Sequence, residues 1–253
     1  EDPQLLAIKP SRTRGEYCWT CSSSIILYCL QEYNLPICTY LDADLYFYND
    51  PCVLIDEMKD KDVLITEHRY TTKYDQSATS GIYCVQFMTF KNTENGLKIL
   101  SWWRNACLEW CYNRFEDGKF GDQKYLDDWT TRFTGIHVLK HLGGGVAPWN
   151  LQQYKLRPNH QMSEITTGKH FNLIFFHFHD IKIINNIIQN NRLLFYDKSY
   201  QFLESLYIPY IKTMNVIKDK FNLKTFRLKV PYLKLFLYVL RKQAAKVKHG
   251  ILN

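Results

Sequence analysis

The sequence predicts an α/β fold in which helices flank a mostly parallel sheet, and two patterns indicate it. Helical segments, with apolar residues every three or four positions, alternate along the chain with short β-branched and aromatic runs. These strand-like runs are apolar almost throughout, as expected where helices cover both faces of a sheet. With 253 residues, 46% of them hydrophobic, the chain can form one well-packed domain with an appendage.

The elements follow in order along the first 180 residues. Residues 20–33 open with Thr and Ser capping residues and continue at helical spacing, which predicts a helix. The run ICTYLDADLYFY, residues 37–48, predicts a strand that stops at the turn signal Asn49-Asp50-Pro51. Strands are also expected over 62–67, 81–90, 136–142 and 173–180, and an amphipathic helix over 97–115.

Beyond Asp180 the composition changes, so we expect a domain over 1–180 and a basic, helical C-terminal appendage over 181–253. The appendage carries 14 Lys and Arg against 3 Asp and Glu. An Asn-rich loop or frayed helix is expected over 185–191, with helices over 197–222 and 230–248. The last of these has the composition of an interfacial helix, which predicts peripheral contact with an anionic membrane; a helix packed on the domain with a solvated basic face is the alternative.

Some classes of protein are disfavoured by the sequence. No motif interleaves the basic residues with stacking aromatics, so we expect no nucleic acid partner. All eight cysteines lie in the first 111 residues, and Cys18-Trp-Thr-Cys21 has no second CxxC to complete a zinc site. We interpret them as reduced thiols of a cytoplasmic protein. No apolar run reaches membrane-spanning length, and EDPQLLAIKP lacks the features of a signal peptide.

The stretch TYLDADLYFYNDP, residues 39–51, contains two carboxylates within an apolar, strand-forming run. Side chains alternate along a strand, so Asp42 and Asp44 should project to the same side, near the C-terminal end of the strand. Ligands bind at that end in open α/β sheets. A divalent cation with oxygen ligands would relieve the repulsion between the two charges, and Mg²⁺ or Mn²⁺ also binds phosphate oxygens. The pair therefore predicts a metal that holds a phosphate.

Two further interpretations of the pair remain open. A haloacid-dehalogenase-type phosphatase also has an apolar strand ending in Asp-x-Asp, and Asp122 and Asp127 could serve as its late acidic motif. Tyr46, however, stands where that class has Thr or Val. A non-catalytic module that binds a carbohydrate or a nucleotide is the second alternative, and it would need no metal.

Four segments together resemble nucleotide-sugar glycosyltransferases of the GT-A type, over roughly residues 12–180. Asp42-Ala43-Asp44 resembles their Asp-x-Asp motif. The segment from Gly121-Asp122-Gln123 to Leu126 is similar to the Asp-Gln segment of glycosyltransferase family eight. The run HLGGGVAPWN, residues 141–150, resembles that family's His-x-x-Gly-x-x-Lys-Pro-Trp segment, and 176–179, Phe-His-Phe-His, resembles a segment of bacterial glycan-assembly transferases.

The resemblance implies a GT-A fold, a Rossmann-like and mostly parallel sheet, and it also has departures. Ala147 replaces the Lys that contacts diphosphate in family eight, so Arg12, Arg14 or Lys140 should make that contact. A GT-A domain has two βα units before its Asp-x-Asp strand, whereas one helix is expected here. The N-terminal βα units would lie outside this sequence, or the base would bind differently; we favour the first interpretation.

The activity that the resemblance implies is transfer of a sugar from a nucleoside diphosphate, with a UDP-sugar favoured, to a hydroxyl of a glycan or lipid-linked acceptor, in bacterial surface-glycan assembly at the inner face of the cytoplasmic membrane. Mn²⁺ or Mg²⁺ would be held by Asp42, Asp44 and His177, with His141 as the competing ligand. Asp122 would take the acceptor proton or, with Gln123, orient the donor sugar. The nucleotide-sugar would further contact a set of residues around the motifs: Arg14, Asp42, Ala43, Asp44, Gly144 and Trp149.

Overall fold

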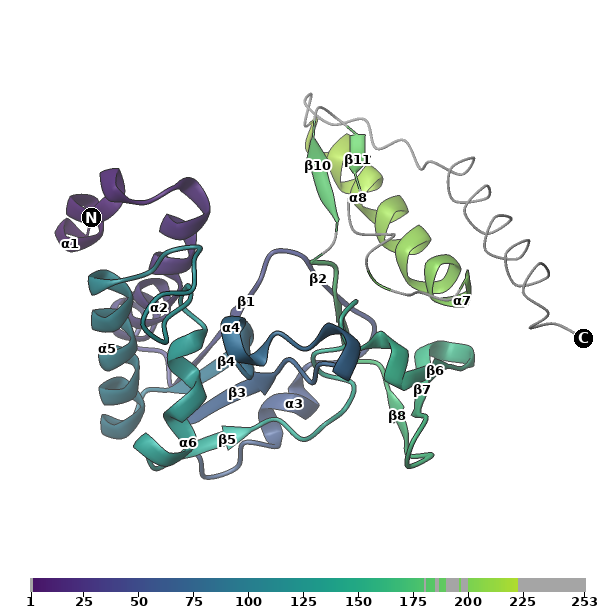
Figure 1. The fold of residues 1–253 in the computed structure, drawn as a ribbon, viewed down its shortest axis with the longest axis horizontal. Coiled ribbons are helices and arrows are strands. Elements are labelled where there is room, and N and C mark those ends of the chain that lie inside the picture. Colours follow the sequence, from purple (N-terminus) through teal and green to yellow (C-terminus); the bar gives the residue numbers. More distant parts are fainter. Residues whose placement is uncertain (1, 180, 185–186, 190–195, 197–199, 223–253) are drawn as a thin grey trace, which may run out of the picture. The chain divides into compact units, whose positions relative to one another are not determined.

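The computed structural model describes residues 2–179, 181–184, 187–189, 196 and 200–222, and Figure 1 shows its elements. The chain divides into two compact units, residues 1–178 and residues 179–253, and each is described by itself. Among the described residues, no helix is both long and apolar enough to cross a membrane.

The first unit contains short and long helices and two kinds of sheet. Its α-helices are α1 (Pro3–Ile8), α2 (Arg14–Glu32), α3 (Cys52–Asp56), α4 (Ser77–Ser80), α5 (Glu94–Glu109) and α6 (Trp129–Arg132). Its 3₁₀ helices are η1 (Lys9–Ser11), η2 (Thr72–Tyr74), η3 (Lys124–Asp128), η4 (Leu151–Gln153) and η5 (Pro158–His160). Its strands are β1 (Ile37–Leu41), β2 (Leu45–Phe47), β3 (Val63–Glu67), β4 (Tyr83–Lys91), β5 (Ile136–Val138), β6 (Tyr154–Leu156), β7 (Gln161–Glu164), β8 (His170–Asn172) and β9 (Phe175–His177).

The main sheet has four strands in the order β1-β4-β3-β5, and it is mixed. Strand β4 runs antiparallel to both β1 and β3, and β3 is parallel to β5. The predicted α/β fold is thus confirmed, whereas the prediction of a mostly parallel sheet is wrong. Apolar strands show that both faces of a sheet are covered, and they carry no information on strand direction.

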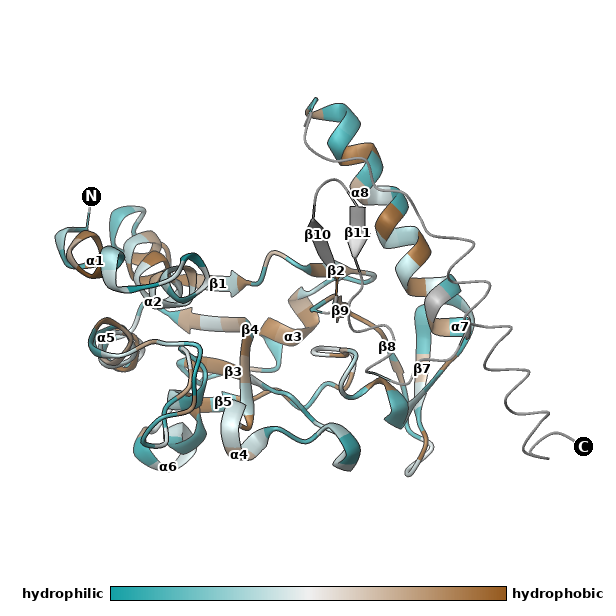
Figure 2. Cartoon of the chain, turned by 45° about the horizontal axis from the view of Figure 1, so that its top comes forward, coloured by the Kyte–Doolittle hydropathy of each residue, from teal (hydrophilic) through white to brown (hydrophobic). Residues whose placement is uncertain are grey.

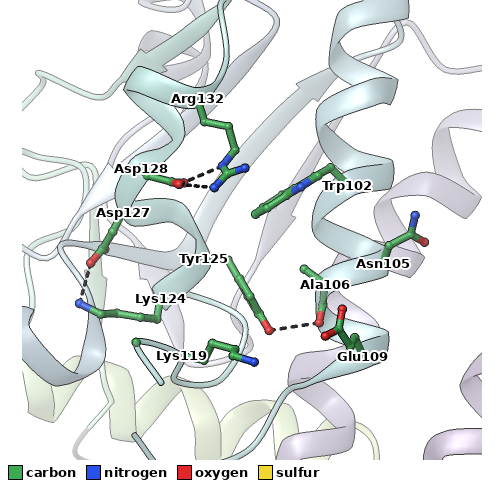
Figure 3. Close-up of a pocket in the computed structure, with 11 residues that line it drawn as sticks. Trp102, Asn105, Ala106, Glu109, Lys119, Lys124, Tyr125, Asp127, Asp128 and Arg132 are labelled. Atoms are coloured by element: carbon green, nitrogen blue, oxygen red, sulfur yellow. Dashed lines mark hydrogen bonds and ion pairs between the residues drawn. The ribbon is translucent and has the colours of Figure 1, made fainter. Parts of the chain in front are cut away.

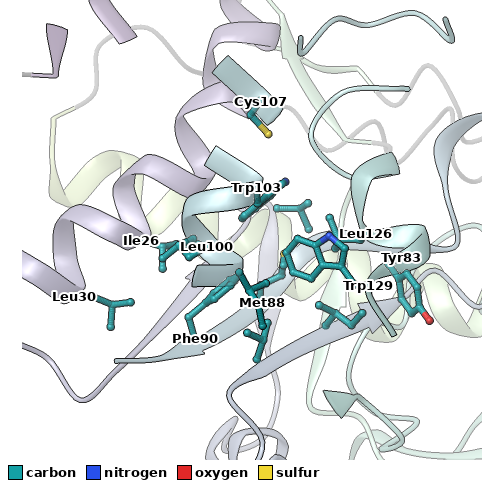
Figure 4. Close-up of a cluster of buried hydrophobic side chains, with 14 of the residues drawn as sticks. Ile26, Leu30, Tyr83, Met88, Phe90, Leu100, Trp103, Cys107, Leu126 and Trp129 are labelled. Carbon is teal, nitrogen blue, oxygen red and sulfur yellow. The ribbon is translucent and has the colours of Figure 1, made fainter. Parts of the chain in front are cut away.

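One face of the main sheet packs against α2 and α5 (Figure 4). Trp103 and Trp129 are fully buried there, and their rings meet edge to face with centroids 5.9 Å apart. Phe90 of β4 stacks on Trp103 at an interplanar angle of 9°. Because large aromatic side chains bury the most apolar surface, this cluster holds the two long helices on the sheet.

The opposite face is covered by α3 and by the segment that leads into β9. Leu54, Leu64 and Phe87 are buried there, and Phe87 stacks on Phe175 with ring centroids 5.4 Å apart. Leu64 faces this cluster while its neighbours in β3, Val63 and Ile65, face the other, as the alternation of a strand requires. Because both faces are covered, the first three residues of β3, Val63 to Ile65, are all apolar.

Helix α2 begins six residues before the predicted start at position 20. The Thr13 hydroxyl accepts a hydrogen bond from the Glu16 N–H, and the Glu16 carboxylate accepts one from the Thr13 N–H. This capping box satisfies free N–H groups at the first turn. Thr20, which was expected to cap the helix, lies inside it, and its hydroxyl donates to the Glu16 carbonyl.

Residues 37–48 form two strands where one was predicted. Strand β1 ends at Leu41, residues 42–44 form a turn, and the Leu45 N–H donates to the Asp42 carbonyl at 3.3 Å. Strand β2 then leaves the main sheet and pairs antiparallel with β9. The residues on both sides of the turn favour strands, so the three residues between them were predicted as part of one strand.

The remaining predicted elements differ mainly in length. Helix α5 ends at Glu109, before the predicted end at 115, and β5 and β9 are shorter than the runs 136–142 and 173–180. A three-stranded antiparallel sheet, β6-β7-β8, was not predicted.

The second unit combines a small hairpin with helices. Strands β10 (Lys182–Ile184) and β11 (Ile187–Gln189) pair antiparallel, so the loop or frayed helix predicted over 185–191 is wrong where the structure describes it. α7 (Tyr200–Phe202), the π-helix η6 (Leu203–Tyr207) and α8 (Ile208–Lys220) follow. Apolar and polar residues alternate along α8, as Figure 2 shows. The helix predicted over 230–248 lies outside the described residues.

Candidate functional site

The turn between β1 and β2 carries both acidic residues of the Asp-x-Asp motif. Asp42 ends the pairing with β4, because its N–H donates to the Gln86 carbonyl at 3.0 Å. At the other end of the turn, the Asp44 carbonyl accepts a hydrogen bond from the Phe178 N–H at 2.8 Å. The pair was expected on one strand, where alternation would align its side chains. The turn aligns them instead.

The two carboxylates meet the ring of His177, which lies in β9 opposite Leu45 of β2. His177 Nε2 is 3.1 Å from Asp44 Oδ1 and 3.9 Å from Asp42 Oδ2. The His177 side chain is 5% exposed, whereas those of Asp42 and Asp44 are 30% and 37% exposed. The structure therefore brings three of the predicted metal ligands together at a point that solvent reaches.

The electrostatics of this point favour positive charge. Burial raises the pKa of Asp42; His177 opposes this shift, and the Asp44 carboxylate adds to it. Burial lowers the pKa of His177, but the Asp44 carboxylate and the Cys84 thiol together raise it more, so that the pKa lies well above its usual value. Two partly desolvated carboxylates thus stabilise a cation at Nε2 or between the three groups.

Strand β4 contributes two residues that the sequence analysis did not single out. Gln86 Oε1 lies 2.9 Å from His177 Nδ1, and both side chains are buried. The Cys84 thiol, two residues earlier on the same face, also lies beside His177, and ligand atoms of Asp42, Cys84 and His177 all fall within 4.8 Å of one another. An amide within the apolar run GIYCVQFMTF was the available signal for Gln86.

The Ala147-Pro148-Trp149-Asn150 segment braces the ring of His177. Trp149 is buried, and its ring lies edge to face with His177, with centroids 5.3 Å apart. Trp149 Nε1 and Asn150 Nδ2 both donate to the His68 carbonyl at 2.8 Å. Asn150 also donates to the Gly145 carbonyl and accepts from the Ala147 N–H, each at 2.9 Å. From these contacts we interpret Trp149 and Asn150 as structural supports of the site.

Three successive glycines, Gly143 to Gly145, precede this segment in the chain and are buried. A Cβ on Gly144 would lie 2.6 Å from Leu139, and one on Gly145, where φ is +87°, would lie 2.9 Å from Thr66. Arg69 donates to the Gly144 carbonyl. Close backbone packing therefore accounts for Gly144, which we had expected to face the diphosphate.

Asp122 is buried at the end of the Gly121-Asp122 turn. Gly121 has a φ of +53°, and the Asp122 carbonyl accepts a hydrogen bond from Trp103 Nε1 at 2.8 Å. Burial, followed by the charge of Asp42, raises the pKa of Asp122 to about 7. The following 3₁₀ helix η3 has Gln123 at its N-cap and no side-chain capping bond, so Asp122 does not cap it.

Asp122 is linked electrostatically to the turn that carries Asp42, through residues of α2 and β1. The Ser22 hydroxyl from α2 lowers the pKa of Asp122 and that of Tyr40, against the larger effect of burial. Burial raises the pKa of Tyr40, and the Asp42 carboxylate raises it further. Asp42, Tyr40, Ser22 and Asp122 thus form one electrostatically coupled group.

Other predicted residues lie differently. Gln123 Nε2 donates to the Ser80 carbonyl at 2.6 Å. Arg14 is exposed in the first turn of α2, and no hydrogen bond or ion pair within the described residues joins it to Asp42 or Asp44. His141 Nδ1 accepts from the Gly143 N–H at 3.1 Å and lines a separate hollow of about 350 Å³ with Lys169 and other residues. His177, and not His141, lies beside the two carboxylates.

A larger pocket, of about 570 Å³, lies between α5 and the segment 118–132 (Figure 3). Four of the charged groups that line it form ion pairs: Lys124 with Asp127 at 2.7 Å, and Arg132 with Asp128 at 2.6 Å. The Tyr125 hydroxyl donates to main-chain carbonyls of α5 and Trp110. This pocket has volume but little unbalanced charge.

The arrangement at Asp42, Asp44 and His177 can hold a divalent ion by two carboxylates and one imidazole. A nearby carboxyl group with a pKa of about 7, Asp122, can accept or release a proton near neutral pH. Together, a charge-neutralising centre and a titratable group suit the departure of an anionic leaving group and the deprotonation of a nucleophile.

Comparison with known proteins finds relatives in Bacillus subtilis (strain 168). "Uncharacterized protein YfnD" is 28% identical over 218 residues, which are 83% of this chain and 68% of YfnD. "Uncharacterized protein YfnF" is 31% identical over 237 residues, which are 88% of this chain and 77% of YfnF. No family model and no solved structure matches the chain. The extent of its similarity to YfnF shows that the chain belongs to the same protein family as YfnF.

Proposed function

We propose that the protein is a metal-dependent glycosyltransferase that moves a sugar from a nucleoside diphosphate to a hydroxyl acceptor. The observation that carries the proposal is the convergence of Asp42, Asp44 and His177 Nε2, with Nε2 3.1 and 3.9 Å from the two carboxylates. The motif resemblance over residues 12–180 supports the same reaction.

The donor set fits a divalent ion. Carboxylate oxygens suit Mg²⁺ and Mn²⁺, and imidazole suits transition metals, so the mixture favours Mn²⁺. Burial lowers the pKa of His177, but Asp44 and Cys84 together raise it above its usual value, which supports the demand for positive charge at this point. Partial exposure of Asp42 and Asp44 leaves room for phosphate oxygens to complete the coordination.

A bound Mn²⁺ or Mg²⁺ supplies the Lewis acid that neutralises charge on the departing nucleoside diphosphate. The side chains of the chain itself hold the geometry in place. Asp42 and Asp44 define one side of the centre, and Trp149 and Gln86 fix the ring of His177 on the other. A centre built in advance loses little energy to reorganisation when the leaving group departs.

Asp122 is our proposed acceptor of the proton from the attacking hydroxyl. A general base works best with a pKa near the operating pH, and burial raises the pKa of Asp122 to about 7. This role favours an inverting reaction, in which a carboxylate activates the acceptor directly. Gln123, next in sequence, would orient the donor sugar. A glycan or a lipid-linked glycan is the proposed acceptor, and its assembly into a bacterial surface glycan is the proposed context.

A binding experiment tests the proposal. Thermal unfolding of the full-length protein is measured with a panel of nucleoside diphosphates and nucleotide sugars, with Mn²⁺ or with EDTA, for wild type, Asp44→Ala and Asp60→Ala. Asp60 is exposed and outside the site, so Asp60→Ala is the matched control. A ligand at 100 times its Kd stabilises by about 2.7 kcal/mol, which the melting temperature reports.

We expect one nucleoside diphosphate and its sugar conjugate to stabilise wild type and Asp60→Ala in Mn²⁺ only, and to leave Asp44→Ala unchanged. Stabilisation without metal, or of Asp44→Ala as much as of wild type, contradicts a metal-dependent transferase. Mn²⁺-dependent release of inorganic phosphate from phosphomonoesters, with no response to nucleotides, would replace the proposal by the phosphatase interpretation.

A further inference from the structure

Gln86 is a buried amide in the middle of the central strand β4. It is 0% exposed and lies between Val85 and Phe87, both buried. A buried amide is costly unless its polar atoms are hydrogen-bonded. The main-chain carbonyl of Gln86 accepts from the Asp42 N–H at 3.0 Å, and its side-chain Oε1 lies 2.9 Å from His177 Nδ1. One residue thus contacts both sides of the proposed metal centre.

The Oε1 contact determines where the ring of His177 carries its proton. An amide oxygen accepts hydrogen bonds and does not donate them, so Nδ1 must donate, and the Nδ1–H form is favoured. The other ring nitrogen, Nε2, faces Asp44 and Asp42, and a metal ion held between these groups would take the place of a proton there and bind the Nε2 lone pair.

The rest of the Gln86 amide is poorly accommodated. Its Nε2 is buried and has no hydrogen-bond partner in the described part of the chain. A Cβ on Gly145 would lie 3.2 Å from this nitrogen, so the glycine leaves the space for it. An unsatisfied buried donor destabilises the folded state, and an apolar side chain of the same size would avoid this cost. The useful part of Gln86 is therefore its carbonyl oxygen.

We propose that Gln86 is the positioning residue of the metal centre: its side-chain oxygen fixes the tautomer and the plane of His177, so that Nε2 is presented to an ion held by Asp42 and Asp44. The inference rests on the proposed metal site and adds to it the residue that sets its affinity. Groups that orient a metal-binding histidine change metal affinity by about 10- to 100-fold when they are removed.

Mn²⁺ affinity, measured by electron paramagnetic resonance of free Mn²⁺, tests the role of Gln86. The full-length variants are Gln86→Met, which removes the acceptor at similar size, and Gln86→Glu, which restores an acceptor. Gln153→Met is the matched control, because Gln153 is a half-buried glutamine that donates to the Arg69 carbonyl at 2.7 Å and does not contact His177. Asp44→Ala reports on the metal site itself.

We expect Gln86→Met to weaken Mn²⁺ binding about 10- to 100-fold, Gln86→Glu to stay within about 3-fold of wild type, and Gln153→Met to equal wild type. A purely structural role for Gln86 predicts otherwise: both Gln86 variants would lose stability in EDTA together and would not separate in affinity. Native Mn²⁺ affinity in a folded Gln86→Met protein overturns the inference.

Nitrogen-15 correlation spectra of the histidine rings in wild type loaded with Zn²⁺, a diamagnetic ion that imidazole binds, provide a test that needs no variant. With the ion bound, we expect the His177 proton on Nδ1; a proton on Nε2 overturns the inference even if Gln86→Met does not fold. The proposed function fails separately, if wild type does not bind Mn²⁺ or if Asp44→Ala binds it equally well.

Discussion

Two places in the first unit, the pocket beside α5 and the β1–β2 turn, differ in how their charges are arranged. In the pocket beside α5, two acidic groups have a basic partner on the same segment, as Asp127 has Lys124 and Asp128 has Arg132. At the β1–β2 turn, Asp42 and Asp44 face one buried histidine. Burial lowers the pKa of His177, but Asp44 and Cys84 together raise it more, so that it lies well above its usual value.

Unbalanced charge, rather than volume, therefore distinguishes the proposed site. The pocket beside α5 measures about 570 Å³, yet its two ion pairs form locally. At the turn, two carboxylates face a single imidazole, which carries one positive charge at most, and this imbalance favours the proposed cation. Strain of this electrostatic kind is typical of sites that bind a charged ligand.

The largest expected effect comes from removing an acidic ligand. Asp44→Ala should lower metal-dependent turnover of the nucleotide-sugar about 1,000-fold or more, because the developing charge on the leaving group loses its neutralising centre. Release of nucleoside diphosphate in Mn²⁺ measures it. Asp128→Asn, in the pocket beside α5, is the comparison and should retain wild-type turnover. Equal losses in both variants would remove the distinction between the two places.

A pH-dependent effect on stability is expected at Asp122. Burial and the charge of Asp42 raise its pKa from 3.8 to about 7, so the folded protein binds a proton that the unfolded chain has lost. The stability that this group contributes is present below pH 3.8 and is lost as the pH rises to about 7. Asp122→Asn should therefore be more stable than wild type at pH 8, by up to about 4 kcal/mol.

Urea unfolding of metal-free wild type and Asp122→Asn at several pH values measures this difference. The two curves should converge towards pH 4 and separate above it, while the variant loses transferase activity. A constant difference across this range would show that Asp122 is already ionised in the folded protein.

Loss of Asn150 should destabilise the support of His177. Asn150→Ala removes three hydrogen bonds and leaves the Gly145 carbonyl and the Ala147 N–H without the partner they have in Asn150, which costs on the order of 3 kcal/mol. Tyr125→Phe is the comparison in the pocket beside α5, because it removes one hydroxyl donor and should cost about 1 kcal/mol. Chemical denaturation at pH 7 measures both. A smaller loss at Asn150 than at Tyr125 would contradict the bracing role.

The smallest effect is expected from an ion pair of the pocket. Arg132 pairs with Asp128, and both side chains are more than 40% exposed. Exposed pairs contribute about 0–1 kcal/mol, so Arg132→Gln should change the free energy of unfolding by less than about 1 kcal/mol and leave Mn²⁺ affinity unchanged. Altered Mn²⁺ affinity in this variant would show that the two places are coupled.

The sequence predicted which residues gather at the β1–β2 turn better than how the turn is built. Asp42 and Asp44 were found because two carboxylates in an apolar run are conspicuous, and His177 was found through a motif. The turn that aligns the two carboxylates was not predicted, because the residues on both sides of it favour strands. Convergence of a turn with β9 depends on pairing between distant segments, which spacing along the chain does not encode.

For other features that were not predicted, the sequence contained a usable signal. The capping box of Thr13 and Glu16 stands in the sequence three residues apart, and it places the start of α2 correctly. Gln86 is a polar residue within a buried strand, and a buried polar side chain requires a hydrogen-bond partner. Strand direction had no such signal. Strand β4 is mostly apolar because both of its faces are buried, and a parallel strand buried on both faces would have the same composition.

Anomalous diffraction at the manganese edge, from crystals grown with Mn²⁺ and a nucleoside diphosphate, tests the central claim most directly. We predict one strong peak in contact with Asp42, Asp44 and His177 Nε2, with diphosphate oxygens on its open side. A manganese peak elsewhere, with no ion between His177 Nε2 and the two carboxylates, would contradict the proposed metal site.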